Sequence, residues 1–384
     1  MQKFEIENFS DYLKNTIDEI KKDEIVDYSI STMNLFARPN SLVEKFLNIL
    51  IENKFKVYYD EKLTERTYVL SDGHYVFKLI PRGPKKNRYK HISDKISSDT
   101  KQKYSEILVN LESRFYQTES KSNWLKKLFS RHPLQFLSAS HIKIAPYTMK
   151  NGDKKVMITS GELSSESSQN NLAVTFKSDK AYDFFKKIIN PNYKIGENLF
   201  EKCIVSEKSY LIADYGNYGS PGVISKIHQL AEEFIIDQPK NVLLITQYNP
   251  SGKMLRAINQ AAKSGAHVTI PLEPVDDYRR RDGGFKFLFA KFKSSVNSNV
   301  NLPTRPNPSH IKCLIVKHKD DSLSMIFGSD NFDSWADHFY RNTEVSLIVN
   351  RANKKDDEYE VVQKTLDKLE NIKEITSKER KLYK

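Results

Sequence analysis

The chain has 384 residues, of which 39% are apolar and 29% are charged. This length and apolar content allow one large or two medium cores and exclude a generally disordered chain. The formal net charge of +12 favours a polyanionic partner, either anionic lipid headgroups or nucleic acid.

Two kinds of targeting segment are missing from the sequence. No apolar run approaches the roughly 20 residues of a membrane-spanning helix, and the first residues, MQKFEIE, lack the apolar stretch of a signal peptide. We therefore expect a cytoplasmic protein. Two cysteines, Cys203 and Cys313, lie among apolar residues and predict buried thiols rather than a disulfide or a metal site. Neither a metal nor a cofactor is predicted.

Apolar periodicity predicts the same order of elements in each half of the chain. The first half is expected to contain a helix over 9–22, a strand over 25–33, a helix over 42–53 and a strand over 55–59. The second half is expected to contain a helix over 223–237, a strand over 241–247, a helix over 253–264 ended by Gly265, and a strand over 268–272. Such alternation predicts an α/β fold with mixed, mostly parallel sheets flanked by helices.

The tripeptide His-Ile-Lys occurs twice, at His141 to Lys143 and at His310 to Lys312. Each histidine is followed 18 residues later by a turn of small residues, TSGELS over 159–164 and GSDNFD over 328–333. An upstream proline-to-valine spacing of 18 residues also repeats, from Pro39 and from Pro250, so the duplication covers nearly the whole chain. A histidine and a lysine two residues apart on a strand point to the same face, and together they suit a phosphate.

The second copy continues to Glu344 and resembles the HxK…GSxN…E signature of the phospholipase D superfamily. The first copy is similar to a degenerate partner of that signature. The resemblance implies two tandem phospholipase D-like lobes, each a mixed, mostly parallel sheet flanked by helices, with the active site at the lobe interface. We expect an N-terminal lobe over 1–180, with a basic insertion at about 80–135, and a C-terminal lobe over 181–384. The insertion is inferred because 84 residues separate Val57 from His141, whereas 42 separate Val268 from His310.

The resemblance also implies a mechanism that needs no metal. One histidine attacks phosphorus to give a phosphohistidine, and the other protonates the leaving oxygen and then activates the incoming alcohol or water. By analogy, His141 is the expected nucleophile and His310 the expected acid and base. Lys143 and Lys312 would hold the non-bridging oxygens. The remaining predicted site residues orient the phosphate or the imidazoles and are Ser160, Glu162, Ser329, Asn331 and Glu344.

The first copy departs from the family pattern at two positions. Glu162 stands where the family has Asn, and a carboxylate there would repel a phosphate unless it points to a histidine or to Lys143. The position of the downstream glutamate reads Leu172-Ala173, so His141 is expected to lack the acidic partner that His310 has. In neither copy does an Asp lie five residues after the lysine, where Thr148 and Lys317 stand instead.

For the substrate, the favoured interpretation is phosphatidyl transfer of the cardiolipin-synthase or phosphatidylserine-synthase type. It draws on the two fused lobes and on the segment TQYNPSG at 246–252, which resembles the strand-end loop of bacterial phosphatidyl transferases. It also draws on an apolar helical stripe beside basic residues that suits a membrane surface, formed by Trp124, Leu125, Leu128 and Phe129. We expect a monomer that binds a phospholipid substrate and an anionic membrane peripherally. The stripe is equally interpreted as a surface helix covering the lobe.

Two other functions remain open. A nuclease or other phosphodiesterase explains the charge equally well and would stack bases on aromatic residues, for which the candidates are Tyr58, Tyr59, Tyr89, Tyr147, Tyr215 and Tyr218. A binding pseudoenzyme would keep both histidines for the lobe interface. The Arg279-Arg280-Arg281 run is interpreted as a loop near the second copy, with gripping of an acidic headgroup as the alternative.

Overall fold

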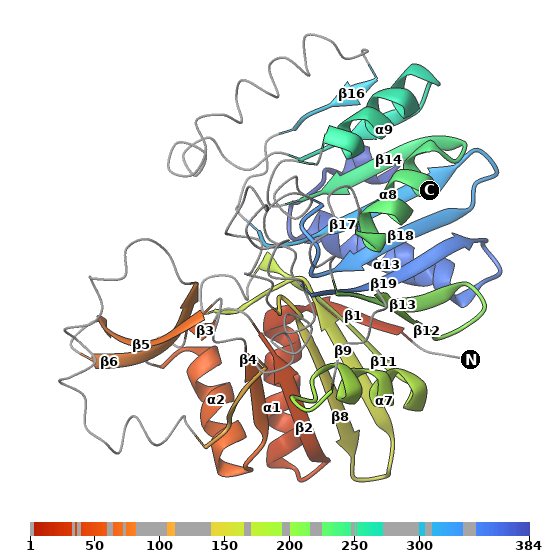
Figure 1. Cartoon of the computed structure of the whole chain (residues 1–384). Coiled ribbons are helices and arrows are strands. Elements are labelled where there is room, and N and C mark those ends of the chain that lie inside the picture. The colour runs from red at the N-terminus through yellow and green to blue at the C-terminus, as the bar shows by residue number, and fades with distance from the viewer. Residues whose placement is uncertain are drawn as a thin grey trace, which may run out of the picture.

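A computed structural model describes residues 4–32, 35–36, 40–59, 64–71, 74–81, 106–111, 140–164, 170–193, 200–215, 225–246, 250, 252–271, 299–303, 309–332 and 343–384. Within these residues the chain forms two large sheets, one from each half of the sequence, and a smaller third sheet. Figure 1 shows the two large sheets, with the red-to-yellow first half below and the green-to-blue second half above.

The first lobe is built on a sheet of seven strands among the described residues. Their order is β1 (Phe4–Asn8), β11 (Leu172–Lys177), β9 (Lys154–Thr159), β8 (Ile144–Met149), β2 (Ile25–Ser31), β4 (Lys56–Tyr59) and β7 (Leu108–Asn110). Helices α1 (Phe9–Lys21) and α2 (Leu42–Glu52) cover one face of it. The Ser41 hydroxyl caps α2 by accepting a hydrogen bond from the backbone amide of Glu44 at 3.2 Å.

The second lobe is built on a sheet of eight strands in the described part of the chain. Their order is β12 (Phe200–Ile204), β13 (Ser209–Asp214), β19 (Glu344–Ala352), β18 (Leu323–Gly328), β17 (Cys313–His318), β14 (Pro239–Ile245), β15 (His267–Thr269) and β16 (Val300–Asn301). Helices α8 (Lys226–Ile236) and α9 (Gly252–Lys263) cover its outer face. Gly265 follows α9 with a φ of +93°, as predicted for a glycine that ends a helix.

The third sheet lies at the edge of the first lobe and was not predicted. Its order is β10 (Leu163–Ser164), β3 (Leu35–Phe36), β6 (His74–Pro81) and β5 (Thr64–Ser71). Strands β5 and β6 form an antiparallel hairpin that stands out at the left of Figure 1.

The prediction of mixed sheets flanked by helices is confirmed, but the balance between parallel and antiparallel pairs differs from the expectation. In the large sheets, parallel pairs occur at one edge of each, β2 with β4 and β7, and β14 with β15 and β16. The remaining pairs are antiparallel. Each βαβ unit is parallel because a helix carries the chain back, whereas the strands that follow each His-Ile-Lys run on as hairpins.

The inner faces of both large sheets share one hydrophobic core, called the central core below. It contains Ile144 and Ile158 from the first lobe together with Ile315 and Leu347 from the second. Helices α7 (Asp179–Ile188) and α13 (Asp357–Asn371) pack against strands of both sheets, α7 against β8, β9 and β12, and α13 against β1, β18 and β19. The short α14 (Ser377–Arg380) follows α13. The two lobes are therefore joined by a continuous core.

None of the helices in the described ranges is long and apolar enough to cross a membrane.

Candidate active site

The two His-Ile-Lys tripeptides lie in extended backbone directly before strands β8 and β17. Ile142 and Ile311, their middle residues, are fully buried in the central core. Since side chains alternate in extended backbone, the histidine and lysine of each tripeptide lie on the opposite side from its isoleucine. Burial of the isoleucines thus fixes the direction of both polar pairs.

The backbone amide of the histidine in each tripeptide donates a hydrogen bond to a residue of the other lobe. The His141 amide donates to the carbonyl oxygen of Thr343 at 3.0 Å, next to a parallel bridge between Ser140 and Thr343. The His310 amide donates to Oδ1 of Asn171 at 3.0 Å. Thr343 and Asn171 directly precede β19 and β11, so corresponding elements of the two lobes exchange these contacts.

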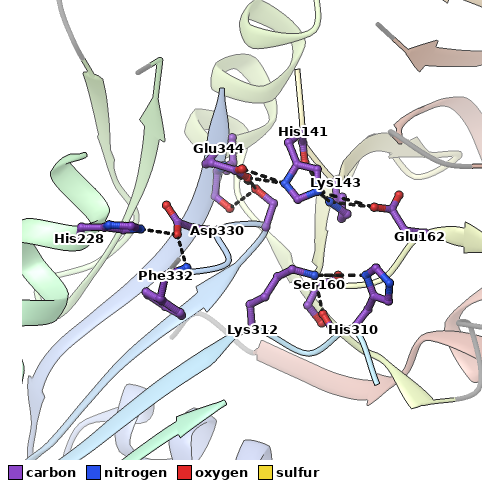
Figure 2. Close-up of polar contacts among 12 residues, drawn as sticks. His141, Lys143, Ser160, Glu162, His228, His310, Lys312, Asp330, Phe332 and Glu344 are labelled. Carbon is purple, nitrogen blue, oxygen red and sulfur yellow. Dashed lines mark hydrogen bonds and ion pairs between the residues drawn. The ribbon is translucent and has the colours of Figure 1, made fainter. Parts of the chain in front are cut away.

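A carboxylate from the second lobe holds the histidine of the first. Nδ1 of His141 lies 2.8 Å and 3.0 Å from the two oxygens of Glu344, which is the first residue of β19 (Figure 2). The Ser329 hydroxyl donates to Oε2 of Glu344 and accepts a hydrogen bond from the amide of Val345 at 3.0 Å. His141 is 4% exposed and Glu344 is 6% exposed, so this hydrogen bond is shielded from water.

The prediction that His141 lacks an acidic partner is therefore wrong. Glu344 follows His310 in sequence but contacts His141, because the start of β19 in the second lobe lies against the residues before β8 in the first lobe. The corresponding position in the first lobe, Leu172, is fully buried in the central core.

The other side of the His141 ring faces the ion pair of Lys143 and Glu162. The residues around His141 are called the first half-site below, and those around His310 the second half-site. Nζ of Lys143 lies 2.7 Å from Nε2 of His141 and 3.1 Å from Oε1 of Glu162. The Thr32 hydroxyl donates to Oε2 of Glu162 at 3.2 Å. An ammonium group only donates hydrogen bonds, so Nε2 accepts and the proton of the neutral imidazole lies on Nδ1, facing Glu344.

Burial and neighbouring charges shift the pKa of both His141 and Glu344, the two partners of the hydrogen bond between the lobes. Burial, assisted by the Lys143 charge, holds the pKa of His141 well below its usual value of 6.5, although Glu162 acts in the opposite direction. Burial, assisted by the Asp330 carboxylate, raises the pKa of Glu344 from 4.5 to about 8, against the lowering effect of Lys143 and Ser329. Burial thus favours the neutral form of the imidazole and raises the affinity of the carboxyl group beside it for a proton.

The second half-site holds its lysine through backbone oxygens. Nζ of Lys312 donates to the carbonyl oxygens of His310 at 2.7 Å and Ser160 at 3.3 Å, and it lies 3.4 Å from Nδ1 of His310. Lys312 is fully buried, whereas His310 is half-buried. Ser160 belongs to the first lobe, so this lysine also reaches across the interface (Figure 2).

In the predicted turns, the hydroxyl of Ser160 and Oδ1 of Asn331 are buried without a hydrogen-bond partner among the described residues. The backbone of Asn331 is held by the Thr246 hydroxyl, which donates to its carbonyl oxygen. Thr246 follows β14 as Thr32 follows β2, so a threonine at the end of each βαβ strand contacts the turn of its own lobe.

Sequence reasoning missed a buried hydrogen bond between His228 and Asp330 behind the second turn. Nε2 of His228, on α8, lies 2.8 Å from Oδ1 of Asp330, and the two side chains are 0% and 2% exposed. The same Asp330 oxygen accepts a hydrogen bond from the amide of Phe332 at 2.7 Å. Phe332 has a φ of +54°, a left-handed conformation that this contact holds in place. His228 has no repeated context in the sequence, so no sequence pattern connects it to Asp330, which lies inside the predicted turn.

The structure thus brings the predicted residues into two adjoining sets, one around His141 and one around His310. The first contains Lys143, Glu162, Ser329 and Glu344, linked in a chain of contacts. Together the sets offer two imidazoles and two fixed positive charges to an anion. Within the described ranges there is no group of three or more His, Cys, Asp or Glu side chains that could hold a metal ion.

Several sequence predictions lie outside the described residues. These are the basic loop at 82–90, the apolar stripe at 122–131, the arginine run at 279–281, Gln247 to Asn249, Tyr89 and Tyr218. Of the other tyrosines proposed for base stacking, Tyr59, Tyr147 and Tyr215 are buried in the hydrophobic cores. Cys313 is buried as predicted, whereas Cys203 is only partly buried, and burial raises the pKa of both thiols.

A family profile described as "Cardiolipin synthase, PLD-like domain" matches residues 234–372. The sequence matches no curated protein. The fold is similar to phosphatidylserine synthase of Haemophilus influenzae Rd KW20, with a TM-score of 0.59 at 10% identity over 95% of this chain and 86% of that one.

Two further solved structures have lower scores. Polyphosphate kinase from Porphyromonas gingivalis gives a TM-score of 0.50 at 9% identity over 97% of this chain and 48% of that one. Yeast tyrosyl-DNA phosphodiesterase gives 0.47 at 11% identity over 92% of this chain and 91% of that one.

Proposed function

We propose that this chain, whose residues 234–372 match a family profile of the phospholipase D-like kind, transfers a phosphatidyl group between alcohols through a phosphohistidine. The observation that carries the proposal is the hydrogen bond from His141 in one lobe to Glu344 in the other, which leaves Nε2 of His141 as the acceptor nitrogen. A neutral imidazole with its free electron pair on a defined nitrogen is what nucleophilic attack on phosphorus requires.

The nucleophile in this proposal is His141. Nε2 forms a bond to phosphorus while the bond from phosphorus to the leaving alcohol oxygen breaks. The ring becomes positively charged as the N–P bond forms, and Glu344 accepts the Nδ1 proton or stabilises it. Burial favours this role because it raises the proton affinity of Glu344 and depresses that of the free ring.

The acid and base is His310, which is more exposed than His141. It gives its proton to the leaving oxygen and then accepts the proton of the incoming alcohol. The oxygen of that alcohol attacks phosphorus, the N–P bond breaks, and His141 is restored. Lys312 holds a non-bridging oxygen throughout, and Lys143 joins it when the phosphorus takes its place at Nε2.

A phospholipid is the proposed substrate, and an anionic membrane that the chain binds peripherally as a monomer is the proposed partner. Support comes from the match to the cardiolipin synthase, PLD-like domain profile and from the similarity of the fold to phosphatidylserine synthase. The net charge of +12 favours an anionic surface. Because three of the six tyrosines considered for base stacking lie in the core, the sequence argument for single-stranded nucleic acid is weaker.

The test is product analysis of the purified chain with liposomes of phosphatidylglycerol or CDP-diacylglycerol, each with acceptor alcohols, and with single-stranded DNA alongside. We expect a new phospholipid in the lipid arm. His141→Ala and His310→Ala should each lower its formation by at least about a thousandfold without changing the circular dichroism spectrum.

If the lipids do not react and the DNA is shortened, the chain is a nuclease and the proposal of phosphatidyl transfer is wrong. A single variant that keeps near-normal activity would contradict the two-histidine scheme, and no reaction on any arm would favour a binding pseudoenzyme.

A further inference from the structure

The backbone of His310 is held to the first lobe by a side chain. Its amide donates to Oδ1 of Asn171 at 3.0 Å. The corresponding amide of His141 donates to the backbone carbonyl oxygen of Thr343, also at 3.0 Å. A backbone acceptor is present whatever residue stands at its position, whereas the acceptor of His310 exists only because residue 171 is Asn. This contact of His310 can therefore be removed by a single substitution.

Asn171 is itself fixed from two directions. It is fully buried, and its carbonyl oxygen accepts a hydrogen bond from the amide of Phe9 at 2.7 Å. Its side chain lies against the turn at 159–164, where a Cβ atom on Gly161 would come within 2.7 Å of both Cβ and Nδ2 of Asn171. The missing side chain of Gly161 thus leaves the space that the amide group occupies. The amide group of Asn171 consequently lies between this turn and the backbone of His310.

The turn that Asn171 contacts is also linked to the other histidine. Its Glu162 forms an ion pair with Lys143 at 3.1 Å, and Nζ of Lys143 lies 2.7 Å from Nε2 of His141. Asn171 therefore connects the backbone of His310 to the residues that surround the proposed nucleophile.

The proposed reaction makes a strict demand on the relative position of the two histidines. In-line displacement places the attacking nitrogen and the leaving oxygen on opposite sides of phosphorus, so the acid must lie across the phosphate from the nucleophile. A misplacement of about 1 Å can cost about a hundredfold in rate. A residue that fixes His310 relative to His141 is therefore expected to affect the reaction without touching the substrate.

We propose that Asn171 is a positioning residue that holds His310 in line with phosphorus and Nε2 of His141 by accepting the hydrogen bond of the His310 amide. This inference rests on the proposed function, since it assumes that a phosphate group binds between the two histidines. It assigns to the reaction a residue that belongs to neither repeated motif.

The test compares two anions that make different demands on geometry, and it does not require turnover. Inorganic phosphate needs only positive charge and hydrogen-bond donors nearby. Orthovanadate also takes a fifth ligand, so it can bond to Nε2 of His141 while His310 hydrogen-bonds to the oxygen on the opposite side, and it thereby imitates the transition state. Dissociation constants of both anions are measured by calorimetry, and their ratio reports the alignment of the two histidines.

The variants are Asn171→Ala, Asn171→Asp and Asn241→Ala. The first removes the acceptor of the His310 amide, and the second keeps an acceptor oxygen in its place. Asn241 serves as the matched control because it is 3% exposed and its Nδ2 donates to the carbonyl oxygen of Leu382. Its neighbour across the strands is Lys317, at the end of β17 remote from His310. Its substitution thus also removes a buried amide group, but not one beside the site.

In the wild type we expect orthovanadate to bind at least about a hundredfold more tightly than phosphate. Asn171→Ala should lower this ratio by about ten- to a hundredfold, chiefly because orthovanadate binds more weakly. Asn171→Asp adds a negative charge that weakens the binding of both anions but should keep the ratio. Asn241→Ala should lower the temperature of thermal unfolding, as Asn171→Ala does, and keep the wild-type ratio. Should Asn171→Ala fail to fold, Asn171→Ser, whose side chain is too short to reach the His310 amide, replaces it.

An unchanged ratio in folded Asn171→Ala would overturn the inference and leave the proposed function intact. The same holds if Asn171→Asp or Asn241→Ala lowers the ratio as much as Asn171→Ala does. If the wild type bound neither anion, or bound orthovanadate no more tightly than phosphate, both the inference and the two-histidine scheme would be overturned.

Discussion

At the centre of the site one imidazole lies between two carboxyl groups that play different parts. Glu344 accepts a hydrogen bond from Nδ1 of His141. Glu162 forms an ion pair with Lys143, which donates to Nε2. The ring is thereby fixed in one tautomer and one orientation before any substrate arrives. Glu344 comes from the second lobe, where it begins β19, whereas His141 precedes β8 in the first lobe.

The raised pKa of Glu344 predicts a pH-dependent loss of stability that Glu344→Gln removes. A carboxyl group whose pKa is higher in the folded than in the unfolded state stabilises the fold fully below the unfolded value, and this contribution is lost as the pH rises through the folded value. For Glu344 the window runs from 4.5 to about 8.

Thermal unfolding of both proteins across this range should show the wild type losing stability relative to the variant as the pH rises. A tenfold change in proton affinity corresponds to about 1.4 kcal/mol, so the difference amounts to at most about 5 kcal/mol. The lowered pKa of His141 acts in both proteins and largely cancels. A difference that stays constant with pH would show that Glu344 is not protonated in this window.

At the residue scale the sequence predicted the participants but not their pairing. Two identical tripeptides with equal spacing to a small-residue turn identified His141, Lys143, His310 and Lys312. The partner of Glu344 was misassigned because proximity in sequence favours His310, whereas the contact runs between lobes. A pairing of residues 203 positions apart leaves no local signal.

At the element scale, the turn after β18 is fixed from behind by helix α8. His228 reaches from that helix to Asp330, and Asp330 in turn holds the amide of Phe332. The end of β18 is close-packed as well, since a Cβ atom on Gly328 would overlap the carbonyl oxygen of Val345. In the first lobe a Cβ on Gly161 would lie 2.7 Å from that of Asn171, so both turns depend on a glycine for close approach.

The contact between His228 and Asp330 behind the turn can be tested with a rescue experiment. His228→Leu leaves Asp330 buried without its partner and should cost about 3–5 kcal/mol of unfolding free energy. Adding Asp330→Asn, which removes the charge and can still accept from the Phe332 amide, should restore part of that loss. The exposed pair Lys240 and Asp321, at 50% and 52% exposure, serves as the control and should contribute less than about 1 kcal/mol. If Asp330→Asn made His228→Leu worse, the cause would be packing rather than an uncompensated charge.

Element positions were largely predictable because both faces of the central strands are buried. Leu314 and Val316 pack beneath α8 and α9 while Cys313 and Ile315 face the central core, which gives the continuous apolar run seen in the sequence. The direction of pairing was less predictable. Hairpins such as β17 and β18 carry the same apolar signal as parallel strands, and the hairpin of β5 and β6 lies in a stretch for which the sequence predicted no element.

At the scale of the whole molecule, the central core belongs to neither lobe alone. Ile142 and Ile311 enter it from opposite lobes, and α7 and α13 contact both sheets. The polar site and the shared core are therefore built by the same two tripeptides.

This shared core predicts that the two lobes unfold together. Denaturant unfolding followed by far-ultraviolet circular dichroism and by fluorescence should give coincident single transitions. Ile142→Ala and Ile311→Ala should each move the whole transition, with a cost of about 2–5 kcal/mol for a large-to-small change in a close-packed core. Two separate phases, with each variant shifting only one, would mean that the lobes are thermodynamically independent.

The single glutamate shared across the interface also bears on how such a protein can evolve. In a pair of identical lobes, every contact made by one copy is repeated by the other, so a carboxylate given to one histidine is given to both. Here the first residue of β19 in the second lobe is Glu344, which contacts His141. The corresponding first residue of β11 in the first lobe is Leu172, which is buried in the central core. Joining both copies in one chain releases each from that symmetry, and the two histidines can then specialise by ordinary point mutation.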